Sequence, residues 1–351
     1  MRKRSFLLAA GVCLASLSLA AGSAMADPSG SPPFRDLAGS GSDTTQGVMN
    51  ALSSVVQIGG TLQVGSYDAG VGATPTMSTK STTACMNIPR PSGSNNGIIA
   101  LVNDRNVGTH CLQFARSSSD NHTSHVGDHL TYIPFATDAV AYAIRGPGAT
   151  PQGSNINRNL SVATLFKIYT CDSSIPANTF QPLLPQFGSG TRKFFLENIL
   201  HVPGGDVQSY ASTFPCVKDK DSNNQPLLEN TGNLLTNDLQ LEPYAISSWT
   251  AQTTKNVTDV HGVTVLGNIA GIPSLAINTT ATGTRQVFNV LPNKLVADGP
   301  NSKATFVGPN SLVCQNAPTI LKQGFVTNAN CGDTSIQSDA NLGTDAVGAG
   351  E

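Results

Sequence analysis

The sequence predicts an α/β protein built from two lobes. Short β-prone apolar runs alternate with stretches in which apolar residues recur every three or four positions. This alternation is typical of strands joined by crossover helices. The chain has 351 residues, which is more than a single hydrophobic core usually supports, so we expect two lobes.

The expected elements follow from these patterns in chain order. We predict strands at residues 61–64, 130–135, 139–144, 286–291 and 304–307. We predict helices at residues 44–56, 97–103, 162–169, 191–199 and 244–252. The helix at 191–199 has the clearest pattern, because Phe194, Phe195 and Ile199 lie on one apolar side and Ser189 or Gly190 can cap its start.

The N-terminus has the form of a cleavable secretory signal. Basic residues 2–4 precede a largely apolar run at 6–21, and Ala24 and Ala26 place small residues at the −3 and −1 positions. We therefore predict that residues 1–26 are a signal peptide and that the protein is secreted or periplasmic. No later stretch has about 18 uninterrupted apolar residues, so we expect no stable membrane insertion.

Charge is sparse and slightly acidic. Charged residues make up 12% of the chain, and its 22 acidic residues outnumber the basic ones. Without a basic block the sequence lacks the electrostatic pattern of a nucleic-acid binder, so no nucleic-acid partner is expected. The tail at 335–351 is rich in Asp, Gly and Ala and is predicted to be disordered.

The cysteines outside the signal peptide are even in number. Of the seven cysteines, only Cys13 lies in residues 1–26, and an even set in an oxidising compartment favours disulfides. The sequence alone allows many pairings; pairing nearest neighbours gives Cys85–Cys111, Cys171–Cys216 and Cys314–Cys331. A metal site is the alternative, but the spacings are wide and no C-x-x-C occurs.

Four turns rich in Gly, Ser, Thr and Asn each lead into a segment with helical character. They are residues 39–45, 92–97, 116–120 and 188–192. A helix start offers unpaired N–H groups and partial positive charge, and Ser and Thr add hydroxyl donors, so such turns can receive anions. Four of them without a Walker motif predict a small ligand held by several loops, which indicates binding more than catalysis.

The order of segments along the chain is also informative. It comprises the turns at 38–45 and 89–97, Phe114-Ala-Arg-Ser-Ser118, Tyr132-Ile-Pro-Phe135, Leu165-Phe-Lys-Ile-Tyr169 and Ser189-Gly-Thr191. Over about residues 36–330 this order resembles the phosphate-binding proteins of bacterial ABC transporters. The resemblance implies a type 2 periplasmic-binding-protein fold, in which two α/β lobes close over an oxyanion. With crossings near Pro134 and Gln286, lobe one would comprise 35–134 with 287–334, and lobe two 135–286.

The resemblance also implies which residues face the ligand. They lie in the four turns and are Ser42, Asp43, Thr44, Ser94, Asn95, Arg116, Ser117, Ser118, Ser189, Gly190 and Thr191. Three departures from the family pattern concern charge. Ser118 stands where the family has an Asp, residues 184–187 lack the family's Arg, and Asp43 stands where an uncharged residue is usual.

These departures bear on ligand selectivity. The family's carboxylate accepts the proton of phosphate and repels sulfate. Without it we expect less than about tenfold preference for phosphate, or ~1.4 kcal/mol, unless Asp43 or Asp138 takes over this role. Arg116 either supplies the missing positive charge or is a surface residue paired with Asp120.

Partners and cofactors follow from the same interpretation. We expect a small oxyanion as ligand, an ABC permease as partner if the role is transport, no cofactor, no metal and a monomer. A secreted binding or adhesive protein that keeps the fold without transport is the alternative.

Two other functions have weaker support in the sequence. His122, His125 and His129 have metal-binding side chains, but a solvated polar loop is the alternative. A secreted hydrolase using Ser189 with His201 or His261 would be expected to have a G-x-S-x-G elbow, which the sequence lacks.

Overall fold

The structure is a computed structural model that describes residues 27–28, 31–69, 74–149, 153–275, 277 and 282–339. The predicted signal peptide at 1–26 lies outside these residues. Within them, no helix has both the length and the apolar character needed to cross a membrane.

One 10-stranded sheet runs through the molecule in the order β10-β11-β8-β13-β7-β1-β4. The strands on this path are β10 (Gln181–Pro182), β11 (Gln240–Ala245), β8 (Leu130–Arg145), β13 (Thr284–Pro292), β7 (Phe114–Ser117), β1 (Leu37–Gly41) and β4 (Val64–Ser66). β12 (Thr264–Ile269) pairs with β8 and with β9 (Asn159–Leu160), and β14 (Val326–Thr327) pairs with β8. Two small ribbons join β2 (Gln57–Ile58) to β3 (Thr61–Leu62) and β5 (Thr76–Met77) to β6 (Ile88–Pro89).

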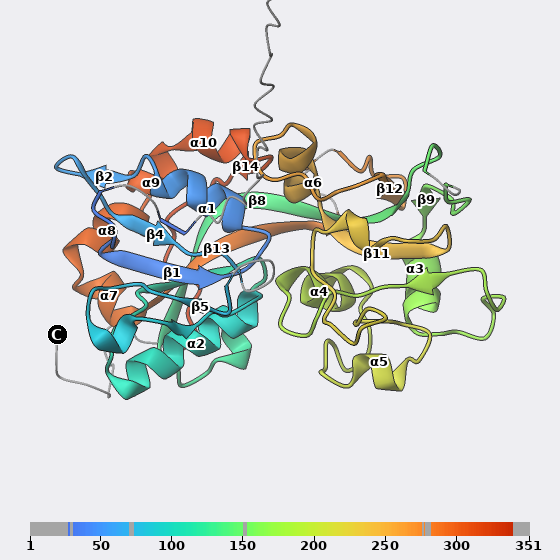
Figure 1. Ribbon diagram of the computed structural model, residues 1–351, viewed down its shortest axis with the longest axis horizontal. Helices are drawn as coiled ribbons and strands as arrows, with labels where there is room; N and C mark the ends of the chain where they lie inside the picture. Colours follow the sequence, from blue (N-terminus) through green and yellow to red (C-terminus); the bar gives the residue numbers. More distant parts are fainter. Residues whose placement is uncertain are drawn as a thin grey trace, which may run out of the picture.

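Two long strands link two lobes. In Figure 1, β8 and β13 run side by side from the lobe that holds β1 to the lobe that holds α3 and α5. β1 is parallel to β4 and β7, whereas β13 is antiparallel to both β7 and β8. The structure therefore has the mixed α/β, two-lobed architecture predicted from the sequence, while the residue limits given above for each lobe stay a proposal.

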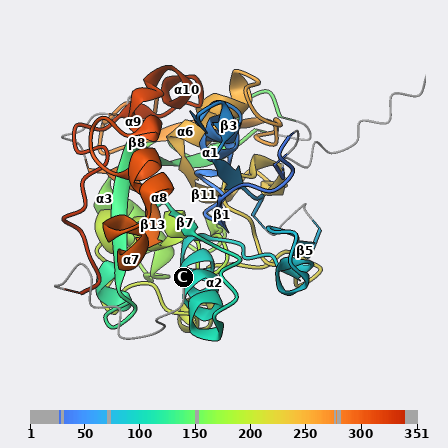
Figure 2. The same cartoon turned by 90° about the vertical axis from the view of Figure 1, so that its left-hand side faces the viewer.

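Helices cover both faces of the sheet in the first lobe (Figure 2). They are α1 (Gln46–Ser53), α2 (Ser94–Val107), α7 (Asn293–Ala297), α8 (Pro300–Phe306), α9 (Leu312–Gln315) and α10 (Ala317–Lys322). One cluster of buried side chains joins α1 and the C-terminal helices to Phe114 and Ile133 of the sheet. A second joins α2 to Ala115 and Tyr132, the neighbours of those residues in sequence. Side chains alternate along a strand, so α2 packs on the opposite face from α1.

The second lobe has its own core. Its helices are α3 (Val162–Tyr169), α4 (Gly190–Phe194) continued by a π-helix (Phe195–Ile199), and α5 (Tyr210–Thr213), with α6 (Ile246–Thr253) near the crossing strands. Short 3₁₀ turns occur at Thr83–Cys85 and His122–Ser124 in the first lobe and at Gly232–Leu234 in the second. Tyr169 and Phe195 pack edge to face with ring centroids 4.9 Å apart inside this core.

Local signals set two of these helices. The Ser161 hydroxyl accepts from the N–H of Thr164 at the start of α3, and the Ser189 hydroxyl accepts from the N–H of Arg192 at the start of α4. Each bond satisfies one unpaired donor of a first helical turn. The predicted helix at 162–169 and the predicted cap at Ser189 are confirmed.

Three sequence predictions differ from the structure. Residues 304–307 were expected to form a strand, but Pro300 begins α8, which ends at Phe306 and buries Thr305 and Phe306. Tyr244 belongs to β11 instead of the following helix. Disorder was expected from residue 335 onward, but residues 335–339 pack on the first lobe, where the N–H of Ser338 donates to the Leu130 carbonyl at 2.9 Å. Residues 340–351 lie outside the described chain.

The three disulfides predicted from the cysteine spacing are confirmed. They join Cys85 to Cys111, Cys171 to Cys216 and Cys314 to Cys331. The first and third lie in the first lobe and the second lies in the second lobe, so none ties the lobes together.

Candidate functional site

Three of the predicted turns meet between the lobes. Gly190 packs so closely against the other lobe that a Cβ there would lie 2.4 Å from the hydroxyl oxygens of both Ser94 and Ser118. The N–H of Asn95 donates to the carbonyl of Gly188 at 3.1 Å. In this structure the lobes are therefore closed at the turns, and glycine at 190 permits the approach.

A carboxylate of the protein sits at this closure. Glu229 Oε1 accepts from the N–H of Thr44 at 3.3 Å, and Oε2 accepts from the hydroxyl of Ser189 and, at 3.2 Å, from the N–H of Thr191. The Thr44 and Thr191 hydroxyls are 3.1 Å apart, and Asn230 Nδ2 donates to Thr44 Oγ1 at 3.1 Å. We call Thr44, Ser189 and Thr191 the receptor; its donors come from both lobes and hold a negative charge.

A guanidinium lies beside the receptor, but not where the family pattern places one. Arg285 of β13 donates to Thr191 Oγ1 at 3.0 Å and to Asp138 Oδ2 at 2.8 Å. Asp138 stands directly opposite Arg285 in β8 and also accepts from the N–H of Ser247 at 3.0 Å. Asp138 is thus fully engaged as an ion-pair partner, so it is not placed to accept a ligand proton.

A cleft of about 720 Å³ opens next to the receptor. It is lined from α1 and the first turn on one side, including Asp43 and Thr44, and from Asn230 and Gln252 on the other. Burial raises the pKa of Asp43 to about 8, and the nearby carboxylates of Glu229 and Asp68 act in the same direction, against the opposing effect of Arg116. The raised pKa favours the protonated form of this carboxyl group, which can donate a hydrogen bond.

The position of Arg116 corrects the sequence analysis. Arg116 is fully buried and does not pair with Asp120 at the surface. Its guanidinium donates to the carbonyls of Ser42 and Tyr67 and to the Ser66 hydroxyl. Burial lowers its pKa to about 10, which leaves it charged at neutral pH. Burial excludes the surface alternative, and Arg116 Nη2 has no hydrogen-bond partner among the described residues.

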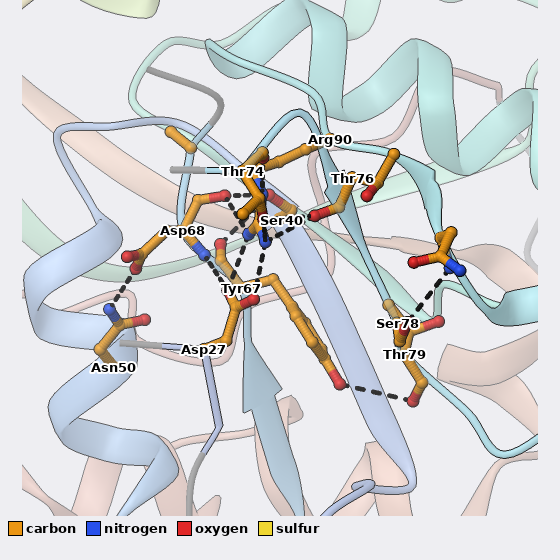
Figure 3. Close-up of polar contacts among 12 residues, drawn as sticks. Asp27, Ser40, Asn50, Tyr67, Asp68, Thr74, Thr76, Ser78, Thr79 and Arg90 are labelled. Carbon is orange, nitrogen blue, oxygen red and sulfur yellow. Dashed lines mark hydrogen bonds and ion pairs between the residues drawn. The ribbon is translucent and has the colours of Figure 1, made fainter. Parts of the chain in front are cut away.

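An ion pair fixes the backbone of Asp68, which also lines the cleft (Figure 3). Arg90 holds Asp27 through two contacts of 2.7 and 2.6 Å and donates to the Asp68 carbonyl at 3.2 Å. Asp27 in turn accepts from the N–H of Asp68 at 3.2 Å, and Asn50 donates to the Asp68 carboxylate at 2.9 Å. The cleft wall is therefore held by the segment that follows the predicted signal peptide.

The remaining predicted residues have different surroundings. Ser94 accepts from the N–H of Ser118 at 3.0 Å, so both lie at the lobe contact. Ser117 bonds its own loop at Ser119, and the third turn continues into a 3₁₀ turn at 122–124 instead of an α-helix. The buried Ser42 hydroxyl has no hydrogen-bond partner among the described residues.

The histidines do not converge. His122 pairs with Asp120, and His125 pairs with Asp128 and contacts Asn95. His129 faces Asp339. No group of three potential metal ligands occurs in the described part of the chain.

Ser189 has no histidine beside it. Its hydroxyl donates to Glu229, whereas His201 contacts the Glu197 carbonyl and His261 contacts Asp259. Ser189 therefore contacts a carboxylate that two backbone N–H groups also hold, and neither histidine of the hydrolase hypothesis reaches it.

Glu229 and Arg285 were missed by sequence reasoning. Glu229 lies in an irregular segment 185 residues from Thr44, and no local pattern connects the two. Arg285 offered a weak signal, since a charged residue at the start of an apolar strand needs a partner when buried.

The fold, with a receptor between two lobes, is that of the type 2 periplasmic-binding proteins. An ABC-type phosphate transport receptor from Vibrio cholerae superposes with a TM-score of 0.51 at 15% identity, covering 83% of this chain and 100% of that one. The phosphate binding protein from Stenotrophomonas maltophilia gives 0.53 at 13% identity, with 84% and 91% covered. A Clostridium perfringens protein with bound phosphate, described as a phosphate ABC transporter substrate-binding protein, gives 0.52 at 15%, with 83% and 99% covered. No protein-family model matches the chain, and no curated protein sequence matches it.

Proposed function

We infer that this chain is an exported, non-catalytic solute-binding protein that takes a small oxyanion at the receptor between its lobes. The observation that carries the proposal is the set of donors around Glu229. Two backbone N–H groups and a serine hydroxyl from separate lobes already hold a carboxylate, so they suit a phosphate or sulfate oxygen equally well.

Other groups near the receptor support an anionic ligand. Arg285 brings positive charge to Thr191. The buried Ser42 hydroxyl would gain a partner from a ligand oxygen. Ser94, Asn95 and Ser118 stay in the proposed site as residues of the lobe contact, which forms as the lobes close. The phosphate-transport proteins of the same fold make an ABC permease the proposed partner.

A second candidate is a secreted protein that keeps the fold without transport. The receptor is already filled by Glu229, and a filled receptor favours this alternative. The response of the unmodified protein to free anions separates the two candidates.

Calorimetry on dialysed protein tests the proposal. We expect binding of inorganic phosphate and sulfate in the millimolar range or tighter, with less than about tenfold selectivity. Thr191→Ala should weaken binding by about 1–3 kcal/mol, because it removes a hydroxyl next to a bound charge. Thr213→Ala, an exposed threonine of α5, is the control. Absence of heat with either anion at millimolar concentration would reject the oxyanion function and favour the second candidate.

A further inference from the structure

Glu229 occupies the receptor in a manner that a surface carboxylate does not. Its side chain is 4% exposed, and both of its oxygens accept hydrogen bonds. One oxygen binds Thr44 of the first lobe and the other binds Ser189 and Thr191 of the second. The carboxylate therefore bridges the lobes.

The backbone next to Glu229 is held firmly. The carbonyl of Asn230 accepts from the Tyr244 hydroxyl at 2.7 Å and from Gln252 at 2.8 Å. The Asn230 side chain accepts from the N–H of Ala245 at 3.0 Å and donates to Thr44. Asn230 also has a φ of 60°, a conformation that Asn tolerates better than most residues. These contacts fix the backbone from which the Glu229 side chain reaches the receptor.

A bound oxyanion and the Glu229 carboxylate cannot share this position. Both would use the same N–H and hydroxyl donors, and two adjacent negative charges repel each other in a buried site. The neighbours Leu228 and Asn230 line the 720 Å³ cleft. The backbone on both sides of Glu229 therefore borders a cleft that lies beside the receptor.

We propose that Glu229 is an intramolecular ligand of the receptor, which closes the lobes without solute and competes directly with the oxyanion. The inference rests on the proposed function, because it names the group that an incoming anion must displace. Glu229 then sets the anion affinity. An anion binds only when its interaction with the receptor is more favourable than that of the Glu229 carboxylate.

The competition predicts a gain of binding on mutation. Glu229→Gln keeps the shape of the side chain but removes its charge, so phosphate and sulfate should each bind at least tenfold more tightly than to the unmodified protein. Glu229→Asp retains the charge on a shorter side chain that reaches Thr44 less well, and should give an intermediate affinity. Glu197→Gln is the matched control, since Glu197 is partly exposed and its carboxylate accepts from Lys193 and from the N–H of Asp206 instead of from the receptor residues.

The experiment is calorimetry of the four full-length proteins with inorganic phosphate and with sulfate, after circular dichroism confirms folding. Small-angle scattering without anion should give a larger radius of gyration for Glu229→Gln, because the bridge between lobes is weakened. Tighter binding by Glu229→Gln than by the unmodified protein supports the inference. Equal affinities overturn it and leave the oxyanion function intact. If no protein binds either anion, the oxyanion function itself fails and the inference fails with it.

Discussion

Removing one partner of the buried ion pair between Asp138 and Arg285 should destabilise the fold strongly. Asp138 is fully buried and Arg285 is 4% exposed, and they face each other on β8 and β13. Asp138 also accepts from the N–H of Ser247 at the start of α6. Asp138→Ala would leave a buried guanidinium without its counter-charge and the Ser247 N–H without an acceptor.

The magnitude follows from this environment. Removing one partner of a buried pair costs about 3–5 kcal/mol. The surface pair Lys193–Glu197, with side chains 25–30% exposed, provides the comparison. Lys193→Ala should cost less than about 1 kcal/mol, because solvent screens an exposed pair.

Urea unfolding followed by fluorescence of Trp249, the only tryptophan, measures both effects. Asp138→Ala should lower the free energy of unfolding by about 3–5 kcal/mol. Asp138→Leu with Arg285→Met should cost less than Asp138→Ala alone, since no unpaired charge is left. A loss from Asp138→Ala no larger than that from Lys193→Ala would refute the reasoning, as would a double variant less stable than the single one.

Three further predictions concern other parts of the chain. Replacing Cys171 and Cys216 by serine should cost about 4 kcal/mol of unfolding free energy, because the bond closes a loop of 45 residues; an unchanged urea midpoint would contradict it. Burial raises the pKa of Glu242 well above its ordinary 4.5, so the folded state retains a proton that the unfolded state has lost, and stability should fall as pH rises above that value. Glu242→Gln should remove this decline, which urea midpoints from acidic to neutral pH can measure; parallel profiles for the two proteins would disprove the assignment. Gly190→Ala should open the lobes because its Cβ would meet the Ser118 hydroxyl at 2.4 Å; an unchanged radius of gyration in solution would exclude that steric role.

The features predicted correctly from sequence were those with local causes. The helix at 162–169 has a Ser161 cap and a regular apolar side, with Leu165 and Ile168 buried. The disulfides joined cysteines that are neighbours along the chain. The strand expected at 304–307 was wrong: Pro300 begins a helix that continues to Phe306, and Phe306 packs in the first-lobe core, so the tertiary context outweighs the β-propensity of these residues.

The features that could not be predicted depend on distant contacts. Glu229 meets Thr44 across 185 positions, and Arg285 meets Thr191 across 94. A sequence window of 15 residues contains neither pair, so its periodicity and composition cannot reveal these contacts. From its turn-like surroundings, Arg116 was assigned either a ligand role or a surface role. Its burial beside Ser42 depends on β1, β4 and β7 lying side by side, which no local sequence pattern shows.

The position of β13 has a consequence for how the chain folds. β13 lies between β7 and β8 and pairs Phe288 with Ser117, yet it is the penultimate strand in the sequence. Until residues 284–292 emerge, the facing edges of β7 and β8 have no partner and present open hydrogen-bonding groups to any other strand. Contacts of such long sequence separation form slowly, so an interval of exposed edges is built into every synthesis of this chain.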